Sequence, residues 1–164
     1  MDPRTAGGYV LSMSRQRYGT ALLALLACTM ATGCGLLPGS HTETCVDWIR
    51  FESPQQLFDD AALVVVGTPT RSDGATSIYG YTAQIHIVEV EKVLKGQPGP
   101  DPLRIASTPE TCTGGISYPH GDPLDGEQRM LIYASHQQGG WFTLTPAQGA
   151  VPFVGDAALP FSAP

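Results

Sequence analysis

The chain is short of basic residues, and the shortage is confined to one part of it. Three of its nine Lys and Arg residues precede residue 34, which leaves six against fourteen acidic side chains over 34–164, a net charge of −8. This balance argues against a nucleic-acid partner, because nucleic-acid interfaces need a basic face. It also argues against electrostatic adhesion to anionic lipid.

The sequence also lacks a catalytic or metal-binding motif. Ser117, His120 and Asp122 lie close together in the chain, but Ser117 occupies no nucleophile elbow, and short spacing in a loop does not set triad geometry. His86, His120 and His136 show no recognisable metal-ligand spacing. We therefore predict a protein that is not an enzyme and needs no metal or cofactor, and a hydrolase is the least favoured alternative.

No apolar run is long enough to cross a membrane as a helix. The longest, residues 21–30, has about ten residues, roughly half of what a transmembrane helix needs. A basic stretch, 14–17, precedes this run, and the small residues Ala31-Thr32-Gly33 and then Cys34 follow it. That order is typical of an export signal.

The segment resembles a bacterial lipoprotein signal peptide, with 31–34 as the lipobox and Ala31 where Leu is usual. The resemblance implies that residues 1–33 are removed and that the thiol of Cys34 receives a diacylglyceryl group, with palmitate as a typical acyl chain. Each buried CH₂ contributes about 0.8 kcal/mol, and two chains suffice for stable anchoring. We expect a lipid anchor in the cell membrane, with the protein on its extracytoplasmic face.

Several alternatives to this address stay open. An ordinary cleaved secretory signal has the same basic and apolar parts, and an uncleaved anchor is a further alternative. Residues 25–28 form a competing lipobox, although they leave a short apolar region. Translation starts at Met1 or at Met13, and a start at Met13 gives a leader of ordinary length.

There are only four cysteines, at positions 28, 34, 45 and 112. Cys28 would leave with the signal and Cys34 would carry lipid, so Cys45 and Cys112 remain as a pair. Disulfides persist in exported proteins, and a bridge here would close a loop of about 67 residues, with a stabilisation of about 4 kcal/mol. We predict this disulfide; two free buried thiols are the alternative.

The remaining chain divides into a flexible tether over 34–44, a folded domain over 45–155 and a frayed tail over 156–164. Nineteen Gly and fourteen Pro, with short β-branched apolar runs, predict an all-β domain. One short helix is expected where Ser53 can cap and Pro54 can occupy the first turn.

Six segments have the length and composition of strands: 62–68, 81–94, 103–107, 129–134, 141–145 and 148–154. Residues 72–77 are expected to form a loop. The inward phase of 81–94 switches at Val88, which predicts a β-bulge or sharp bend. His86 lies on the polar phase of that strand and is expected at the surface.

Five to six strands with one helix and one disulfide outline a small OB-like barrel. The order of signals resembles the netrin-like module, the family of the tissue inhibitors of metalloproteinases. The resemblance rests on Cys45, 61–68, 81–96, Cys112 and 126–133. It implies the barrel and a general binding role. The inhibitors chelate zinc through a free N-terminal Cys-x-Cys, which this chain lacks, so inhibition by that route is not implied.

The sequence thus favours a membrane-anchored, extracytoplasmic lipoprotein that acts as a binding or interaction module. Its partners would be the lipid bilayer, through acylated Cys34, and an envelope protein. The candidate binding-loop residues are Tyr118, His120, Asp122 and Trp141. A structural envelope lipoprotein without a defined ligand is the alternative.

Overall fold

The computed structural model describes residues 42–99, 102–155 and 157–163. The predicted signal peptide, the predicted lipidation site Cys34 and all but the last residues of the tether lie outside the described residues. Within the described ranges, no helix is long and apolar enough to cross a membrane.

The described chain contains one helix followed by six strands. They are α2 (Pro54–Asp60), β1 (Leu63–Ile78), β2 (Tyr81–Lys95), β3 (Leu103–Ala106), β4 (Met130–Gln137), β5 (Gly140–Thr143) and β6 (Ala150–Pro152). The all-β prediction with one short helix is confirmed.

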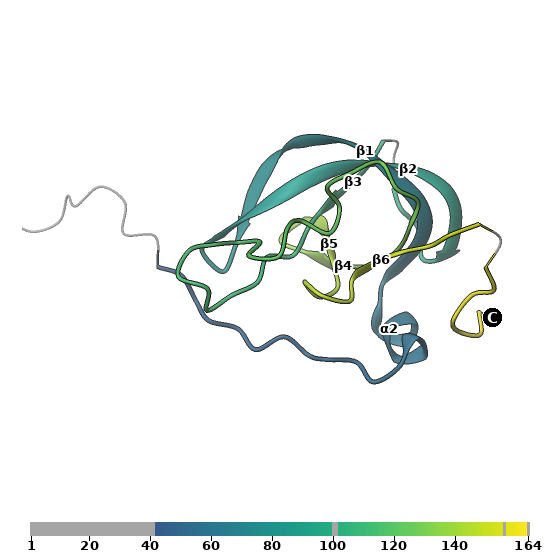
Figure 1. Cartoon of the computed structure of the whole chain (residues 1–164), viewed down its shortest axis with the longest axis horizontal. Helices are drawn as coiled ribbons and strands as arrows, with labels where there is room; N and C mark the ends of the chain where they lie inside the picture. The colour runs from purple at the N-terminus through teal and green to yellow at the C-terminus, as the bar shows by residue number, and fades with distance from the viewer. Residues whose placement is uncertain (1–41, 100–101, 156, 164) are drawn as a thin grey trace, which may run out of the picture. The chain divides into compact units, whose positions relative to one another are not determined.

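The strands form a closed mixed barrel of OB-like topology, as predicted (Figure 1). Hydrogen bonding follows the order β1-β2-β3-β5-β4, and an antiparallel β1–β4 pairing closes the barrel. The β3–β5 pair is parallel, whereas the other pairs are antiparallel. The sixth strand, β6, pairs with the first residues of β4, 130–132.

The helix begins where the sequence predicts it. The side chain of Ser53 accepts a hydrogen bond from the backbone N–H of Gln56, and Pro54 follows in the first turn. The C-terminal end of the helix contacts the end of β2. There, Nζ of Lys95 donates to the carbonyl oxygens of Phe58 and Asp59 at 2.7 and 2.8 Å. A cation at these carbonyls satisfies acceptors that the helix leaves open.

Two apolar layers lie on the two sides of the β1–β4 wall. The barrel interior holds Leu63, Val65, Val88, Leu103, Ile105, Met130 and Ile132, with Leu124 from the long β3–β4 connection. The outer layer holds Val64, Val66, Leu131 and Tyr133 under α2. Alternate residues of β1 thus serve opposite layers, which explains its uninterrupted apolar run.

The C-terminal residues pack on this outer layer, so the prediction of a frayed tail is wrong for 157–163. The Phe161 ring is buried and stacks on Phe58, with ring centroids 4.4 Å apart. Tyr133 meets Phe161 edge-on, and the backbone N–H of Ser162 donates to Gln55. The aromatic contacts give this short segment enough buried surface to dock.

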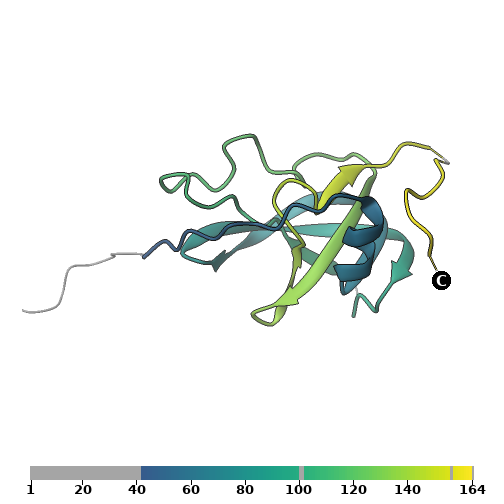
Figure 2. The same ribbon diagram turned by 90° about the horizontal axis from the view of Figure 1, so that it is seen from below.

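Residues 72–77, predicted as a loop, belong to β1. They pair with β2 as far as Ile78↔Tyr81, so the two strands form one long hairpin (Figures 1 and 2). The hairpin register shifts four times, and one shift lies between Pro69 and Arg71, opposite the phase switch at Ile87 and Val88. The predicted bulge is therefore present, but at this point the extra residue lies in β1.

The predicted disulfide joins Cys45 to Cys112. Next to it, the hydroxyl of Thr111 bonds both the backbone N–H and the carbonyl of Val46. The backbone N–H of Thr44 donates to the Tyr79 carbonyl at the hairpin turn. These links fix residues 44–46 at the hairpin turn and at 111–112, and the chain then continues to α2 (Figures 1 and 2).

Candidate functional site

The four predicted binding-loop residues do not share one site. The side chains of Tyr118 and Asp122 are occupied by internal hydrogen bonds. His120 lies exposed at the tip of the β3–β4 connection. Trp141 lines a groove on another part of the barrel. The structure therefore divides the set into two loop anchors, one exposed histidine and one groove residue.

Asp122 is a hub that ties the β3–β4 connection to the barrel. Its carboxylate accepts hydrogen bonds from the hydroxyl of Ser107 and, at 2.9 Å each, from Nε2 of His86 and the backbone N–H of Leu124. Burial on its own would raise the pKa of Asp122, but the hydrogen bonds from His86, Ser107 and Leu124 outweigh it and lower this pKa.

His86 is buried, and its predicted surface position is wrong. The register His86↔Ile105 sets it on the same face as a fully buried core residue. Its side chain is only 6% exposed, and that of Asp122 only 9%. A polar ring is tolerated there because the carboxylate of Asp122 meets it.

Tyr118 is the second anchor of the same connection. Its hydroxyl donates to the carbonyl of Ser107 at 2.6 Å and accepts from the backbone N–H of Gln84 at 2.9 Å. Burial of the phenol raises the pKa of Tyr118, with a further contribution from the charge of Asp122. Both hydrogen-bonding functions of the hydroxyl are used, so the tyrosine fixes the loop on β2 and β3.

The Ser107, His86 and Asp122 cluster does not have the geometry of an acyl-transfer triad. Ser107 is fully buried and its hydroxyl donates to the carboxylate of Asp122, and His86 bonds the same carboxylate instead of the serine. A triad needs the serine next to the histidine and open to substrate. Residues 42–99, 102–155 and 157–163 also hold no group of three or more His, Cys, Asp and Glu that could bind a metal ion.

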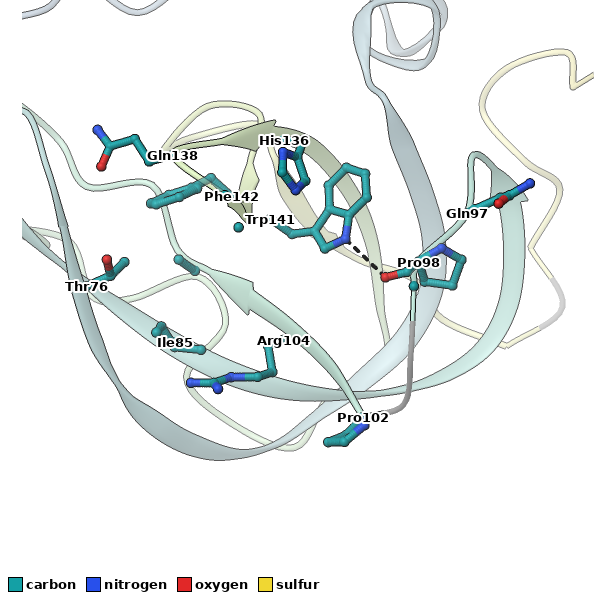
Figure 3. Close-up of a pocket in the computed structure, with 14 residues that line it drawn as sticks. Thr76, Ile85, Gln97, Pro98, Pro102, Arg104, His136, Gln138, Trp141 and Phe142 are labelled. Atoms are coloured by element: carbon teal, nitrogen blue, oxygen red, sulfur yellow. Dashed lines mark hydrogen bonds between the residues drawn. The ribbon is translucent and has the colours of Figure 1, made fainter.

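A groove of about 580 Å³ lies over β2, β3 and β5 (Figure 3). Its floor is a row of apolar side chains, because the pairings Ile85↔Ala106 and Ala106↔Phe142 align these three residues across the strands. Residues 97–99 and Pro102 form one end, and the β4–β5 turn forms the other.

Trp141 joins those two ends (Figure 3). Its indole N–H donates to the carbonyl of Pro98 at 3.1 Å, and its ring meets His136 edge-on at 5.1 Å. The indole donor is therefore used inside the protein. What the groove presents at this point is an aromatic surface held in a fixed position.

Arg104 is the one formally charged residue among the described lining residues of the groove, and its partner Asp73 lies outside the lining. Arg104 is paired with Asp73, with Nε of the guanidinium 3.0 Å from the carboxylate. Gln97, Gln138, His136 and Thr76 supply the other side-chain donors and acceptors. None of the described lining residues is an acid.

Sequence reasoning found Trp141 in this groove and missed the rest of its lining. Ile85, Arg104 and Phe142 lie in segments that the sequence predicts only as strands. They become one surface only because β2, β3 and β5 are neighbours in the sheet. Gln97 and Gln138 lie in the flanking loops, and the sequence does not predict that these two loops lie at the ends of one groove.

No protein-family model matches this sequence, and no curated protein sequence matches it.

Proposed function

We propose that this protein is a lipid-anchored, extracytoplasmic binding module that takes its ligand in the groove over β2, β3 and β5. The observation that supports the binding role is the fixed aromatic ring of Trp141 in a groove with an apolar floor. Concave surfaces with apolar walls and a few convergent polar groups are the usual form of small-ligand sites.

The size and construction of the groove support this role. About 580 Å³ lies within the range of roughly 300–1,000 Å³ common for such sites. The groove is built on strands, with Phe142 buried beneath it, and sites on rigid elements hold their geometry well. By contrast, the side chains of Tyr118 and Asp122 are held by hydrogen bonds within the protein.

The address rests on the sequence. The basic stretch 14–17, the apolar run 21–30 and the lipobox 31–34 support acylation of Cys34 and retention in the cell membrane. Palmitate labelling of the full chain tests this proposal. Cys34→Ala should remove the label and release the protein from the membrane fraction, while Cys28→Ala should keep both; a labelled Cys34→Ala variant would contradict it.

The kinship with the netrin-like module is part of the same proposal. It is supported by the OB-like strand order. It is also supported by Lys95, which belongs to the stretch 81–96 of the resemblance and donates from the end of β2 to a helix carbonyl. The fold alone does not select a ligand. The acidic character of residues 34–164 supports the expectation that nucleic acid is not a partner.

The groove is tested by site-specific photo-crosslinking of the full chain in its own membrane. A photoreactive residue at Gln138, in the groove, should give a light-dependent adduct. The same residue at exposed Gln128, outside the groove, is the matched control. Equal adducts at both positions, or none at Gln138, would contradict a binding role for the groove and would favour the structural lipoprotein.

A further inference from the structure

We infer that the groove binds an uncharged saccharide chain, which would stack on Trp141 and hydrogen-bond to the carboxamides of Gln97 and Gln138. This inference rests on the proposed function and adds the chemical class of the ligand. It follows from the charge of the groove, the pairing of its strands and the kinds of groups that line it.

Charge selects against ionic ligands of both signs. The guanidinium of Arg104 is already paired with Asp73, and residues 34–164 carry a net charge of −8, so an anionic chain is repelled from the domain as a whole. A cationic ligand meets no carboxylate among the described lining residues. An uncharged ligand avoids both costs.

Strand pairing selects against an extended peptide. A peptide that adds to a sheet needs a strand edge with open backbone groups. Strand β3 is paired with β2 on one side and β5 on the other, and β5 is paired with β3 and β4. A ligand in this groove is therefore recognised through side chains, because β3 and β5 offer it no open sheet edge of backbone N–H and C=O groups.

The side chains present the two surfaces that a sugar ring needs. One face of a pyranose is a patch of C–H groups, which packs on an aromatic ring, and the Trp141 ring is fixed by its bond to Pro98. The rim of the sugar carries hydroxyl groups, each of which both donates and accepts. Carboxamides match them, because the Gln side chain has both an acceptor oxygen and two N–H donors.

The positions of the carboxamides fit a chain rather than a single ring. Gln97 lies in the loop after β2, and Gln138 lies in the β4–β5 turn (Figure 3). Trp141 comes between these two ends of the groove. A chain that stacks one ring on Trp141 can place the hydroxyls of flanking rings against both glutamines.

The test uses the full chain in detergent with Trp48→Phe, which leaves Trp141 as its one tryptophan, since the sequence has two. The probes are uncharged tetrasaccharides of glucose and N-acetylglucosamine in β-1,4 and α-1,4 linkage. Tetragalacturonate is the anionic counterpart, and tetraalanine amide is the peptide control. We expect a saturable change in Trp141 fluorescence with at least one uncharged tetrasaccharide, confirmed by calorimetry, and at least tenfold weaker binding of the two controls.

Substitutions then locate the contact. Gln97→Ala and Gln138→Ala should each weaken saccharide binding at least fivefold with an unchanged melting temperature. Gln128→Ala, an exposed glutamine outside the groove, should leave binding unchanged. Equal effects of Gln128→Ala and Gln138→Ala would overturn the inference, as would tighter binding of tetragalacturonate or of the peptide.

Failure of the saccharide inference can be told apart from failure of the proposed function. If none of the uncharged probes binds while Gln138 still crosslinks specifically, the groove remains a binding site and the saccharide class is wrong. If the probes fail and Gln138 gives no specific adduct, both the saccharide class and the binding role are wrong.

Discussion

The carboxylate of Asp122 meets Nε2 of His86 at 2.9 Å, and the two side chains are among the least exposed polar groups of the domain. They lie 36 residues apart in the chain. With Ser107, this pair attaches the β3–β4 connection to the end of the barrel. Its energetic importance follows from its burial, because a buried polar group that loses its partner is costly.

Asp122→Ala should destabilise the protein by about 3 kcal/mol, because it leaves Ser107 and His86 buried without an acceptor. Urea unfolding followed by circular dichroism measures this loss. The neighbour Asp125 provides a matched control, since Asp125→Ala removes an exposed carboxylate and should change the stability by less than about 0.5 kcal/mol. Equal effects of the two substitutions would show that the hub does not stabilise the fold.

The same carboxylate makes stability depend on pH in the acid range. The folded pKa of Asp122 is lowered, so its stabilisation is present above the unfolded value of about 3.9 and is lost as the pH falls through the folded pKa. Urea midpoints measured between about pH 5 and pH 2 should therefore fall more steeply for the native chain than for Asp122→Asn. Parallel curves would place the acid sensitivity in other carboxylates.

Gly96→Ala should destabilise the protein by about 3 kcal/mol or more. Gly96 has a φ of +77°, and a Cβ there would lie 2.2 Å from the carbonyl oxygen of Ala62. Gly74 has a similar φ of +88° with nothing within 4 Å, so Gly74→Ala isolates the backbone cost of about 1–2 kcal/mol. The difference between the two unfolding free energies measures the close approach of β2 to the start of β1.

Removal of the disulfide should cost about 4 kcal/mol, because the bridge closes a separation of 67 residues in the unfolded chain. A Cys45→Ala and Cys112→Ala double variant tests this by urea unfolding. Reductant should lower the stability of the native chain to that of the double variant and should have no effect on the variant itself. A native chain whose stability resists complete reduction would contradict the prediction.

Phe161→Ala should destabilise the protein by about 2–4 kcal/mol, since the ring is buried against Phe58 and Tyr133. Thermal unfolding gives the comparison with Val154→Ala. Val154 is 81% exposed in the same C-terminal region, and its loss should change the stability by less than about 0.5 kcal/mol. An unaffected Phe161→Ala variant would restore the expectation of a frayed tail.

Local chemistry determined what the sequence could predict. The start of α2 depends on Ser53 and Pro54, which act within one turn of the chain. The β-branched run at the start of β1 and the short apolar run of β4 predicted strands because composition and run length are local properties. The disulfide followed from counting, since only Cys45 and Cys112 remained after the expected signal and lipid site.

Tertiary structure decided the features that depend on distant partners. His86 is buried because Asp122 lies over it, and the alternation of β2 contains no information about that carboxylate. Residues 72–77 are part of β1 because β2 offers them hydrogen-bonding partners, although their composition is that of a loop.

The groove is the clearest case of this division. The sequence contained Trp141 as a candidate but gave no reason to group it with Ile85, Arg104 and Gln97. The parallel pairing of β3 with β5 makes their strands neighbours, and these residues then line one groove. Sequence patterns report which residues can be buried or paired, whereas a binding surface depends on which strands are neighbours, and only the closed barrel fixes that order.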